Sequence, residues 1–461
     1  MKRAELIDIY QSALKAADPY RAVANHLSLA GSTLSAGGEH YDLDRFRRIV
    51  VIGAGKGTAP MAQAVEEILG DRIDEGIIVV KYGHTRPLRK IVQKEAAHPL
   101  PDEAGTKATA EIRELLKKAG EETLVICLLS GGASSLLVAP ADGITLNDKR
   151  AMTDLLLSAG ADIQELNAVR KHLSAVKGGR LAEIAYPATI ISVILSDVIG
   201  DRLDVIASGP TVPDSTGFRD ALNVIHRYSL EKKIPNGVFS LLHLGVTGVI
   251  PDTPKSGAVF FKKTQNIVVG SIRQSIEAAR VRATELGFEP HFLESDLQGE
   301  AKDVARSLAS KAIEMQSAMR PGDSPRCLLA GGETTVTVRG KGKGGRNQEL
   351  AIAFALGIEG RDGISLLSAG TDGTDGPTDA AGAVVDGTTA AKAREQGLDP
   401  VEYLANNDSY TFFRKFDELT GEKAHLLTGP TGTNVMDLQI TLMEKSAAGA
   451  GEAHSAIGNR G

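Results

Sequence analysis

Residues 47–69, RRIVVIGAGKGTAPMAQAVEEIL, decide the fold. They begin with a short run rich in Ile and Val, pass through a turn that holds three glycines, and continue with the spacing of a helix. A strand that leads through a glycine turn into a helix is the first half of a β-α-β unit. The stretch therefore predicts a parallel sheet that is covered by helices.

The same alternation of strand-like and helix-like segments recurs along the chain. Residues 76–83, 123–132 and 188–197 are β-branched runs, and a helical pattern lies at 108–118. Strands that alternate with helices are typical of α/β folds with a mostly parallel sheet. The chain is therefore predicted to be an α/β protein.

Turn-forming residues mark a predicted domain border near residue 250. The alternation resumes beyond it, so we expect two α/β domains. Residues 1–250 would form an N-terminal Rossmann-like domain with a parallel-sheet α/β/α sandwich, and residues 251–445 a C-terminal mixed α/β domain. Residues 446–461 are small and polar, and we expect them to form a disordered tail.

Composition excludes several classes of protein. Hydrophobic residues make up 42% and charged residues 24% of the 461 residues, as in ordinary globular proteins. The balance of 52 Lys and Arg against 58 Asp and Glu gives a net charge of −6, which argues against nucleic acid as a partner. No apolar run approaches the roughly 20 residues of a membrane helix. Cys127 and Cys327 lie in apolar runs typical of reduced thiols and the N-terminus lacks the apolar core of a signal peptide, so we expect a cytoplasmic protein.

The glycine turn after the first strand is a candidate anion site. A turn that feeds a helix N-terminus presents backbone N–H groups to an anion, and a lysine adds a full positive charge. The turn matches neither the dinucleotide fingerprint, since Thr58 replaces its third glycine, nor the Walker A motif. A tight turn with an exposed lysine is the alternative. The candidate residues are Gly53, Gly55, Lys56 and Gly57.

A second glycine loop follows the strand at 123–129. Its hydroxyl groups can donate hydrogen bonds to a carboxylate or a phosphate. The loop does not fit the G-x-S-x-G pattern of a nucleophilic serine. The candidate residues are Ser130, Gly131, Gly132, Ser134 and Ser135.

Residues 167–180 gather basic side chains around a Gly-Gly pair. A solvated basic face is the usual explanation for such a run. The glycine interruption favours a site for an anionic ligand instead, with Lys171 and Lys177 as candidates.

Acidic candidates follow the ends of other predicted strands. Asp197 comes directly after the run 190–195, where ligands of open α/β sheets lie. Asp372 shares a glycine-rich loop with Asp375 and Asp379, and carboxylates of this kind suit a hard cation. Helix or turn capping is the alternative for each of them.

A third Gly-Gly pair, Gly331 and Gly332, precedes Glu333. The following segment 339–346 interleaves four cations with glycine, which predicts a mobile loop that wraps around phosphates. Arg346 lies just ahead of a predicted helix and is the best placed of these cations.

Taken in order, seven motifs of this chain resemble the MOFRL-type glycerate kinase family, the class called glycerate 2-kinase. The resemblance runs from the first strand to about Leu442. The motifs are VIGAGKG, LLSGGASSLL, LNAVRKHLSAVKGGRLA, SDVIGDRLDVIASGPTVPD, LAGGETTVTVRGKGKGGRNQELAIA, SAGTDGTDGPTDAAGA and TGPTGTNVMDL.

The resemblance implies a two-domain α/β enzyme with its active site in the interdomain cleft. It would transfer the γ-phosphoryl group of ATP, with Mg²⁺, to the 2-hydroxyl of D-glycerate and so form 2-phosphoglycerate. The family's key lysine falls on Lys56 and its key arginine on Arg346. From the residues themselves, we expect the SGGASS loop with Lys171 or Lys177 to hold the glycerate carboxylate. Asp197, and after it Glu333 and Asp372, are the candidates for Mg²⁺.

Two other functions stay open at this point. Relatives of this family have been labelled hydroxypyruvate reductases, which would use NAD(P)H, but Lys81 stands where a dinucleotide site needs an acidic residue. A sugar-acid sensor without catalysis would also suit the fold, because a fold does not fix a function. The sequence leaves the oligomeric state open, a homo-oligomer included.

Overall fold

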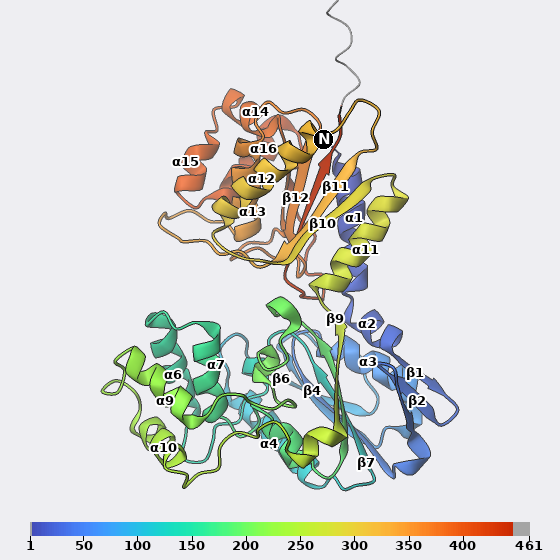
Figure 1. The fold of residues 1–461 in the computed structure, drawn as a ribbon, viewed down its shortest axis with the longest axis vertical. Coiled ribbons are helices and arrows are strands. Elements are labelled where there is room, and N and C mark those ends of the chain that lie inside the picture. Colours follow the sequence, from blue (N-terminus) through green and yellow to red (C-terminus); the bar gives the residue numbers. More distant parts are fainter. Residues whose placement is uncertain (1, 446–461) are drawn as a thin grey trace, which may run out of the picture. The chain divides into compact units, whose positions relative to one another are not determined.

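A computed structural model describes residues 2–445, and these residues fall into two compact units (Figure 1). The parallel-sheet unit comprises residues 18–271. The mixed-sheet unit comprises residues 2–17 and 272–445. The tail predicted at 446–461 lies outside the described residues.

The parallel-sheet unit is built on strands in the order β6-β5-β4-β7-β8-β9, and each neighbouring pair is parallel. An antiparallel meander, β1-β2-β3, is attached to the unit. The strands are β1 (Leu27–Ala30), β2 (Thr33–Ala36), β3 (Glu39–Asp42), β4 (Arg48–Ala54), β5 (Glu75–Lys81), β6 (Ile91–Ala96), β7 (Thr123–Leu129), β8 (Thr189–Leu195) and β9 (Thr264–Gly270).

Helices enclose this sheet, as the β-α alternation predicts. The helices are α2 (Pro19–His26), α3 (Thr58–Leu69), α4 (Glu103–Lys117), α5 (Ala133–Leu136), α6 (Leu146–Ser158), α7 (Ile163–His172), α8 (Arg180–Ala185), α9 (Phe218–Arg227) and α10 (Asn236–Val246). Apolar residues of α4 and α8 share one core with β4 and β7. Helices α6, α7, α9 and α10 form a lobe with a hydrophobic core of its own. This helical lobe lies beside the sheet in Figure 1.

The division between the units differs from the predicted border. Strand β9 pairs with β8 and so extends the parallel sheet to Gly270, which moves the division from residue 250 to the point after Ser271. The turn-rich segment near 250 lies inside the parallel-sheet unit.

The mixed sheet has the strand order β10-β11-β15-β12-β13-β14. Only the β10–β11 pair is parallel among these described strands. The strands are β10 (Glu289–Leu297), β11 (Arg326–Gly332), β12 (Ile364–Gly370), β13 (Gly382–Asp386), β14 (His425–Leu426) and β15 (Asp437–Met443). The helices are α1 (Arg3–Ala16), α11 (Ile272–Glu285), α12 (Ala301–Ser317), α13 (Arg346–Gly357), α14 (Thr389–Glu395), α15 (Pro400–Ala405) and α16 (Ser409–Thr420).

Helix α1 begins the chain yet belongs to the mixed-sheet unit. It packs on α11 and contacts β12 and β15. Leu6 and Ile9 are fully buried, and the hydroxyl of Tyr10 donates a 2.7 Å hydrogen bond to the carbonyl oxygen of Gly370. The N-terminal helix is therefore part of the core of this unit.

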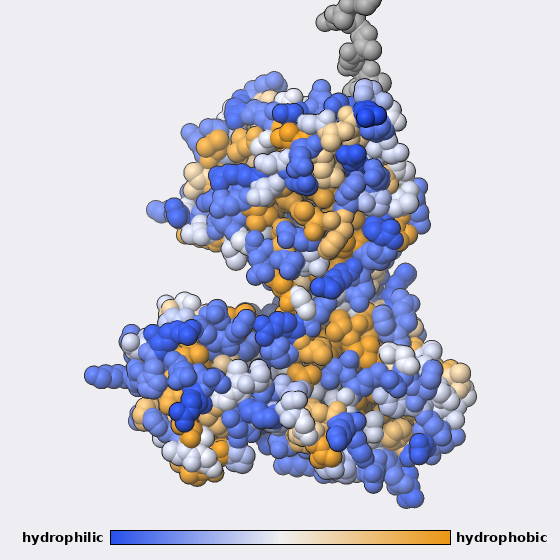
Figure 2. All heavy atoms as spheres, viewed as in Figure 1, coloured by the Kyte–Doolittle hydropathy of each residue, from blue (hydrophilic) through white to orange (hydrophobic). Residues whose placement is uncertain are grey.

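These sheets confirm the predicted fold class, a two-domain α/β protein with one parallel and one mixed sheet. Among the described residues, no helix is long and apolar enough to cross a membrane. On the face drawn in Figure 2, hydrophilic residues are spread over both units.

Candidate active site

The two glycine loops of the parallel-sheet unit lie side by side, after β4 and after β7. The backbone N–H of Gly57 donates to Ser130 Oγ over 3.0 Å, and the N–H of Lys56 donates to the carbonyl oxygen of Gly131 over 2.8 Å. The hydroxyls of Thr58 and Ser130 are also 3.0 Å apart. Because these bonds occupy the N–H groups of Lys56 and Gly57, the Lys56 side chain is the positive group that this turn offers to a ligand.

Close approach explains the glycines in the first loop. Gly55 has φ +142°, and a Cβ at Gly53 would lie only 2.9 Å from the Cβ of Leu128 in the neighbouring strand. Larger residues would push the two loops apart. The turn therefore holds Lys56 in a fixed place.

His98 is a neighbour of Lys56 that sequence analysis missed. A Cβ at Gly132 would lie 2.9 Å from His98 Nε2 and 3.3 Å from Lys56 Cγ, so both side chains flank this glycine. Burial, together with the charges of Lys56 and Lys81, lowers the pKa of His98 to about 4. The imidazole is therefore neutral near pH 7 and adds no charge of its own. No motif surrounds His98, so only the fold brings it to the site.

Asp197 follows β8 and lies against the second loop. A Cβ at Gly131 would contact its carboxylate, so this glycine admits the carboxylate to the loop. The structure thus brings Lys56, Ser130, Gly131 and Asp197 together at the carboxyl end of the parallel strands, where ligands of open α/β sheets lie.

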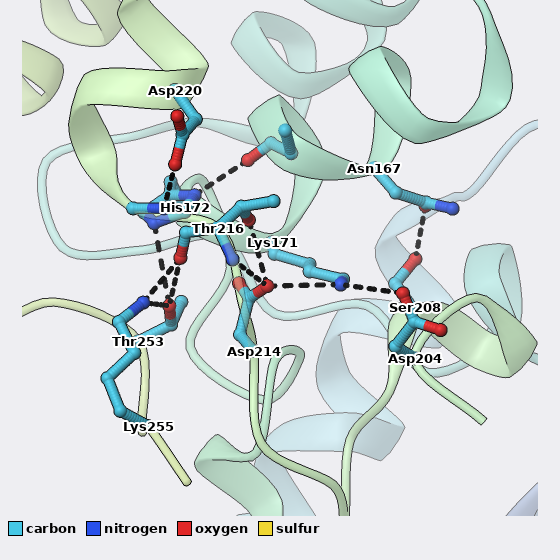
Figure 3. Close-up of polar contacts among 12 residues, drawn as sticks. Asn167, Lys171, His172, Asp204, Ser208, Asp214, Thr216, Asp220, Thr253 and Lys255 are labelled. Atoms are coloured by element: carbon cyan, nitrogen blue, oxygen red, sulfur yellow. Dashed lines mark hydrogen bonds and ion pairs between the residues drawn. The ribbon is translucent and has the colours of Figure 1, made fainter. Parts of the chain in front are cut away.

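Lys171 is held in an ion pair (Figure 3). Its Nζ lies 3.2 Å from Asp214 Oδ1 and 3.9 Å from Asp204 Oδ2, and its side chain is almost fully buried. Although burial acts to raise it, hydrogen bonds from Thr216 and the charge of Lys171 hold the pKa of Asp214 below its ordinary value. Lys171 therefore ties α7 to the segment that follows β8, and the structure does not bring its ammonium to the SGGASS loop.

Lys177 and the hydroxyls of the second loop lie around one cavity. Lys177 Nζ donates to the carbonyl oxygen of Ala207 over 3.1 Å. Ser134 Oγ lies 3.3 Å from Ser208 Oγ, and Ser135 Oγ donates to the carbonyl oxygen of Gly132 over 3.1 Å. The structure thus places Lys177 beside the SGGASS loop, whereas Lys171 pairs with Asp214.

Arg346 is the first residue of α13 in the mixed-sheet unit, and two carboxylates hold it. Its Nε and Nη2 donate to the two oxygens of Asp437 over 2.5 and 2.9 Å, and Nη1 donates to Glu333. Burial raises the pKa of Asp437 to about 6, while Arg346 acts to lower it. A bidentate pair fixes the plane of a guanidinium as well as its position. Asp437 is a second residue that sequence analysis missed, because its partner Arg346 lies 91 residues away in the sequence.

The three aspartates of the 371–379 loop have separate partners. Asp375 is buried and accepts from the backbone N–H groups of Asn347 and Gln348, so it caps the start of α13. Asp372 accepts from Thr374 within its own turn, and Asp379 accepts from Tyr410. These contacts match the capping alternative, and the loop does not gather its carboxylates around one point. Within residues 2–445, no group of three or more His, Cys, Asp or Glu side chains is arranged to hold a metal ion.

Packing accounts for Gly331 and Gly332 at the end of β11. A Cβ at Gly331 would lie 2.9 Å from Ile272 Cδ1 of α11, and one at Gly332 would lie 2.8 Å from Leu297 Cα in β10. These glycines allow neighbouring elements to approach the strand that leads to Glu333. A role in binding phosphate stays a prediction for both.

The prediction of a mobile basic loop at 339–345 is wrong, because its backbone is fixed. The N–H groups of Arg339 and Gly340 donate to Asn407 Oδ1 over 2.8 and 2.9 Å, and the N–H of Lys343 donates to Asp408 Oδ1 over 3.0 Å. A Cβ at Gly340 would collide with the backbone of Asn406. The alternating glycines thus let the loop lie flat against residues 406–408.

Comparisons with known proteins identify the family of this chain. A family model described as a domain of unknown function (DUF4147) matches residues 5–243, and the MOFRL family model matches residues 326–437. The D-glycerate 2-kinase of Thermotoga maritima is 42% identical over 438 residues, which cover 95% of this chain and 97% of that protein. The chain belongs to the MOFRL-type glycerate kinase family. This confirms the resemblance that the seven motifs indicate.

Structures and names of other family members extend the comparison. The crystal structure of the Thermotoga maritima glycerate kinase is similar with a TM-score of 0.83 at 41% identity, covering 96% of this chain and 99% of that one. A protein of Agrobacterium vitis called putative hydroxypyruvate reductase is 40% identical and covers 94% of this chain and 93% of its own length. Lys56 and Asp197 lie within the first family model, and Glu333, Arg346 and Asp437 lie within the second or at its end.

Proposed function

We propose that this protein, a kinase of the MOFRL-type glycerate kinase family, transfers the γ-phosphoryl group of ATP to the 2-hydroxyl of D-glycerate and forms 2-phosphoglycerate and ADP. One observation carries the proposal. The two cations that the family resemblance singles out, Lys56 and Arg346, are each held in place by dedicated neighbours. The names of relatives that cover nearly the whole chain support the substrate.

Phosphoryl transfer requires positioning and positive charge more than covalent chemistry. The locked loops hold Lys56 so that its ammonium can meet the transferring phosphoryl group. The Asp437 pair holds the guanidinium of Arg346 in one plane, ready to contact the same group. An active site formed by both domains, as the resemblance implies, stays a prediction.

The remaining candidates take roles in binding. Gly53, Gly55 and Gly57 position Lys56, and Ser134, Ser135 and Lys177 would contact phosphate or carboxylate oxygens. Lys171 is the weakest of the proposed ligand contacts, because Asp214 already pairs with it. Glu333 and Asp372 are similarly engaged, by Arg346 and by a turn.

Mg²⁺ would enter with ATP, because it usually binds substrate phosphates and only one or two protein carboxylates. Asp197 fits that requirement, since its carboxylate lies against Gly131 in the loop that contacts Lys56. When bound, the ion would neutralise charge on the phosphates. Asp197 is also the group best placed to accept the proton of the substrate hydroxyl.

The reductase alternative finds support in the names of some relatives. Lys81 ends β5, beside β4, where an acidic residue would bind the ribose of a dinucleotide. Oxidation of NADH by hydroxypyruvate in the absence of ATP would favour this alternative. Tight binding of glycerate without turnover would favour a sensor.

A coupled assay tests the proposal. Purified protein is incubated with Mg·ATP and D-glycerate, and the product is passed to enolase, which accepts 2-phosphoglycerate but not the 3-isomer. Signal without phosphoglycerate mutase is expected. Signal only with mutase would move the phosphate to the 3-hydroxyl, and absence of signal in both cases would overturn the kinase assignment.

A further inference from the structure

A cavity of about 380 Å³ lies within the parallel-sheet unit, beside the Lys56 turn. One wall comes from α6 and α7 of the helical lobe, and the other from the segment before α4 and the SGGASS loop. Most of its lining is apolar, with Val138, Met152, Leu156, Val169 and Leu173 among the lining residues. Gly132 lines the cavity as well, and Lys56 lies against the same glycine. The cavity therefore opens beside the proposed site of phosphoryl transfer.

Four basic side chains line this cavity, Lys149, Arg150, Arg170 and Lys177, and so does the exposed carboxylate of Asp154. Lys149 and Lys177 are only 8% and 2% exposed, and Arg170 lies between them in sequence. Lys149 Nζ donates to the carbonyl oxygen of Leu173 over 3.0 Å, as Lys177 Nζ does to Ala207. Among residues 2–445, none of the ion pairs that the structure shows includes Lys149, Arg150, Arg170 or Lys177. Each ammonium has three N–H donors, so the lysines retain donors beyond the one carbonyl oxygen that each contacts.

Buried ammonium groups without a partner carry a high desolvation cost. Burial, together with the nearby charge of Arg170, lowers the pKa of Lys149 to about 7. Burial also lowers the pKa of Lys177 far below its usual range. Lys171, six residues before Lys177, shows how the same unit satisfies a buried lysine that has a structural role, since it pairs with Asp214. The cavity cations lack such a carboxylate, which points to an anion supplied from outside the chain.

Charge and lining together indicate the class of this anion. A single carboxylate could accept hydrogen bonds from only part of this cluster of basic side chains, whereas the phosphates of a nucleotide carry several negative charges and more acceptor oxygens. A small hydroxy acid has no apolar face, but a purine base suits an apolar wall. Cavities of roughly 300–1,000 Å³ with apolar walls and a few polar groups typically hold ligands of nucleotide size.

We propose that this cavity binds the adenine nucleotide of the kinase reaction, with phosphate oxygens on Lys149, Arg170 and Lys177 and the base against the apolar wall of α6 and α7. The inference rests on the proposed function, because it gives ATP and ADP a place in it. It also changes the expected ligand of Lys177, which would bind the nucleotide phosphates instead of the glycerate carboxylate.

Binding measurements on the full chain test the assignment. Dissociation constants for ADP and for D-glycerate are measured by titration calorimetry with the wild-type protein, Lys149→Met and Lys177→Met. We expect each substitution to weaken ADP binding at least tenfold and to change glycerate binding less than twofold. Lys107→Met, an exposed lysine on α4, is the matched control and should change neither constant.

A second variant probes the apolar wall without removing a cation. Thr153→Trp narrows the cavity from α6, and it should weaken ADP and adenosine binding while glycerate binding stays unchanged. This variant keeps the assignment testable if a lysine substitution prevents folding. Weakened glycerate binding with unchanged ADP binding would make the cavity the hydroxy-acid site and overturn the proposal. Unchanged binding of both ligands, or equal loss of both, would also overturn it.

The outcome is separable from that of the proposed function. If the wild-type protein phosphorylates D-glycerate but the variants bind ADP normally, only the cavity assignment fails. If the protein binds ADP through these lysines but does not phosphorylate glycerate, the cavity assignment holds and the substrate is wrong.

Discussion

The two units differ in whether carboxylates pair with their candidate ligand-binding cations. In the parallel-sheet unit, Lys149 and Lys177 donate to backbone carbonyl oxygens, and none of the ion pairs shown among the described residues includes either lysine. In the mixed-sheet unit, Arg346 is held by Asp437 and Glu333. The lysines can therefore pair with an anionic ligand. The carboxylates beside Arg346 balance part of its charge and fix the direction of its guanidinium. The lysines of the parallel-sheet unit are therefore suited to attract an anionic ligand, whereas Arg346 of the mixed-sheet unit is suited to contact a ligand in one fixed orientation.

The largest expected effect is the loss of either family cation. Lys56→Ala and Arg346→Ala should each lower kcat/KM by about 10²- to 10⁵-fold, because each removes charge that stabilises the transferring phosphoryl group. Steady-state kinetics with D-glycerate and ATP measures the loss, with Lys107→Met as the control. Near-normal turnover of either variant would remove that cation from the mechanism.

Loosening the Arg346 clamp should have a smaller effect. Asp437→Asn keeps the shape of the side chain but removes the bidentate ion pair, so Arg346 is expected to lose its orientation. Misplacing a group by about 1 Å can cost about 10²-fold, and we expect kcat to fall by about 10- to 100-fold while KM changes little. Recovery in Asp437→Glu would support an orienting role. An unchanged kcat would mean that orientation of Arg346 does not matter.

The unpaired lysines should appear in the pH dependence of stability. The folded pKa of Lys149 is about 7 against an ordinary value of 10.5, so the unfolded chain binds more protons between these pH values. The free energy of unfolding should therefore rise with pH across this window, by at most about 1.4 kcal/mol per pH unit from this group. Urea unfolding from pH 7 to 10 should show a shallower rise in Lys149→Met than in Lys107→Met. Equal slopes would show that Lys149 is not desolvated.

The smallest effect concerns the contact between the two glycine loops. Ser130→Ala leaves the buried N–H of Gly57 and the hydroxyl of Thr58 without their shared partner. A loss of about 1–3 kcal/mol in the free energy of unfolding is expected. The matched control is Ser307→Ala, at an exposed position of α12, which should change stability by less than about 0.5 kcal/mol. If the two variants were equally stable, the loops would not depend on Ser130.

The sequence predicts local features well and long-range partners poorly. Alternating strands and helices indicate both sheets, and the positions of Lys56, Gly131 and Asp197 just after three predicted strands place them at one edge of the parallel sheet. Lys171 and Lys177 look alike in the sequence, but Asp214, 43 residues beyond Lys171, distinguishes them.

Partners that are distant in the sequence also explain the predictions that the structure corrects. The basic loop appears mobile until residues 406–408 are placed beside it, about 65 residues further along the chain. Strand β9 is recognisable as a strand, yet its sheet is decided by pairing with β8. Asp375 resembles a cation ligand, but the fold places it at the start of α13. In each case the deciding partner is distant in sequence, where no local pattern records it.

Proton-coupled ³¹P NMR of the reaction mixture tests the central claim most directly. Protein, Mg·ATP and D-glycerate are mixed, and the new phosphate ester resonance is recorded. Transfer to the 2-hydroxyl predicts a doublet, because the ester phosphorus couples to the single hydrogen on C2. A triplet, from the two hydrogens on C3, would contradict the assigned position, and absence of a new ester resonance would contradict the kinase function itself.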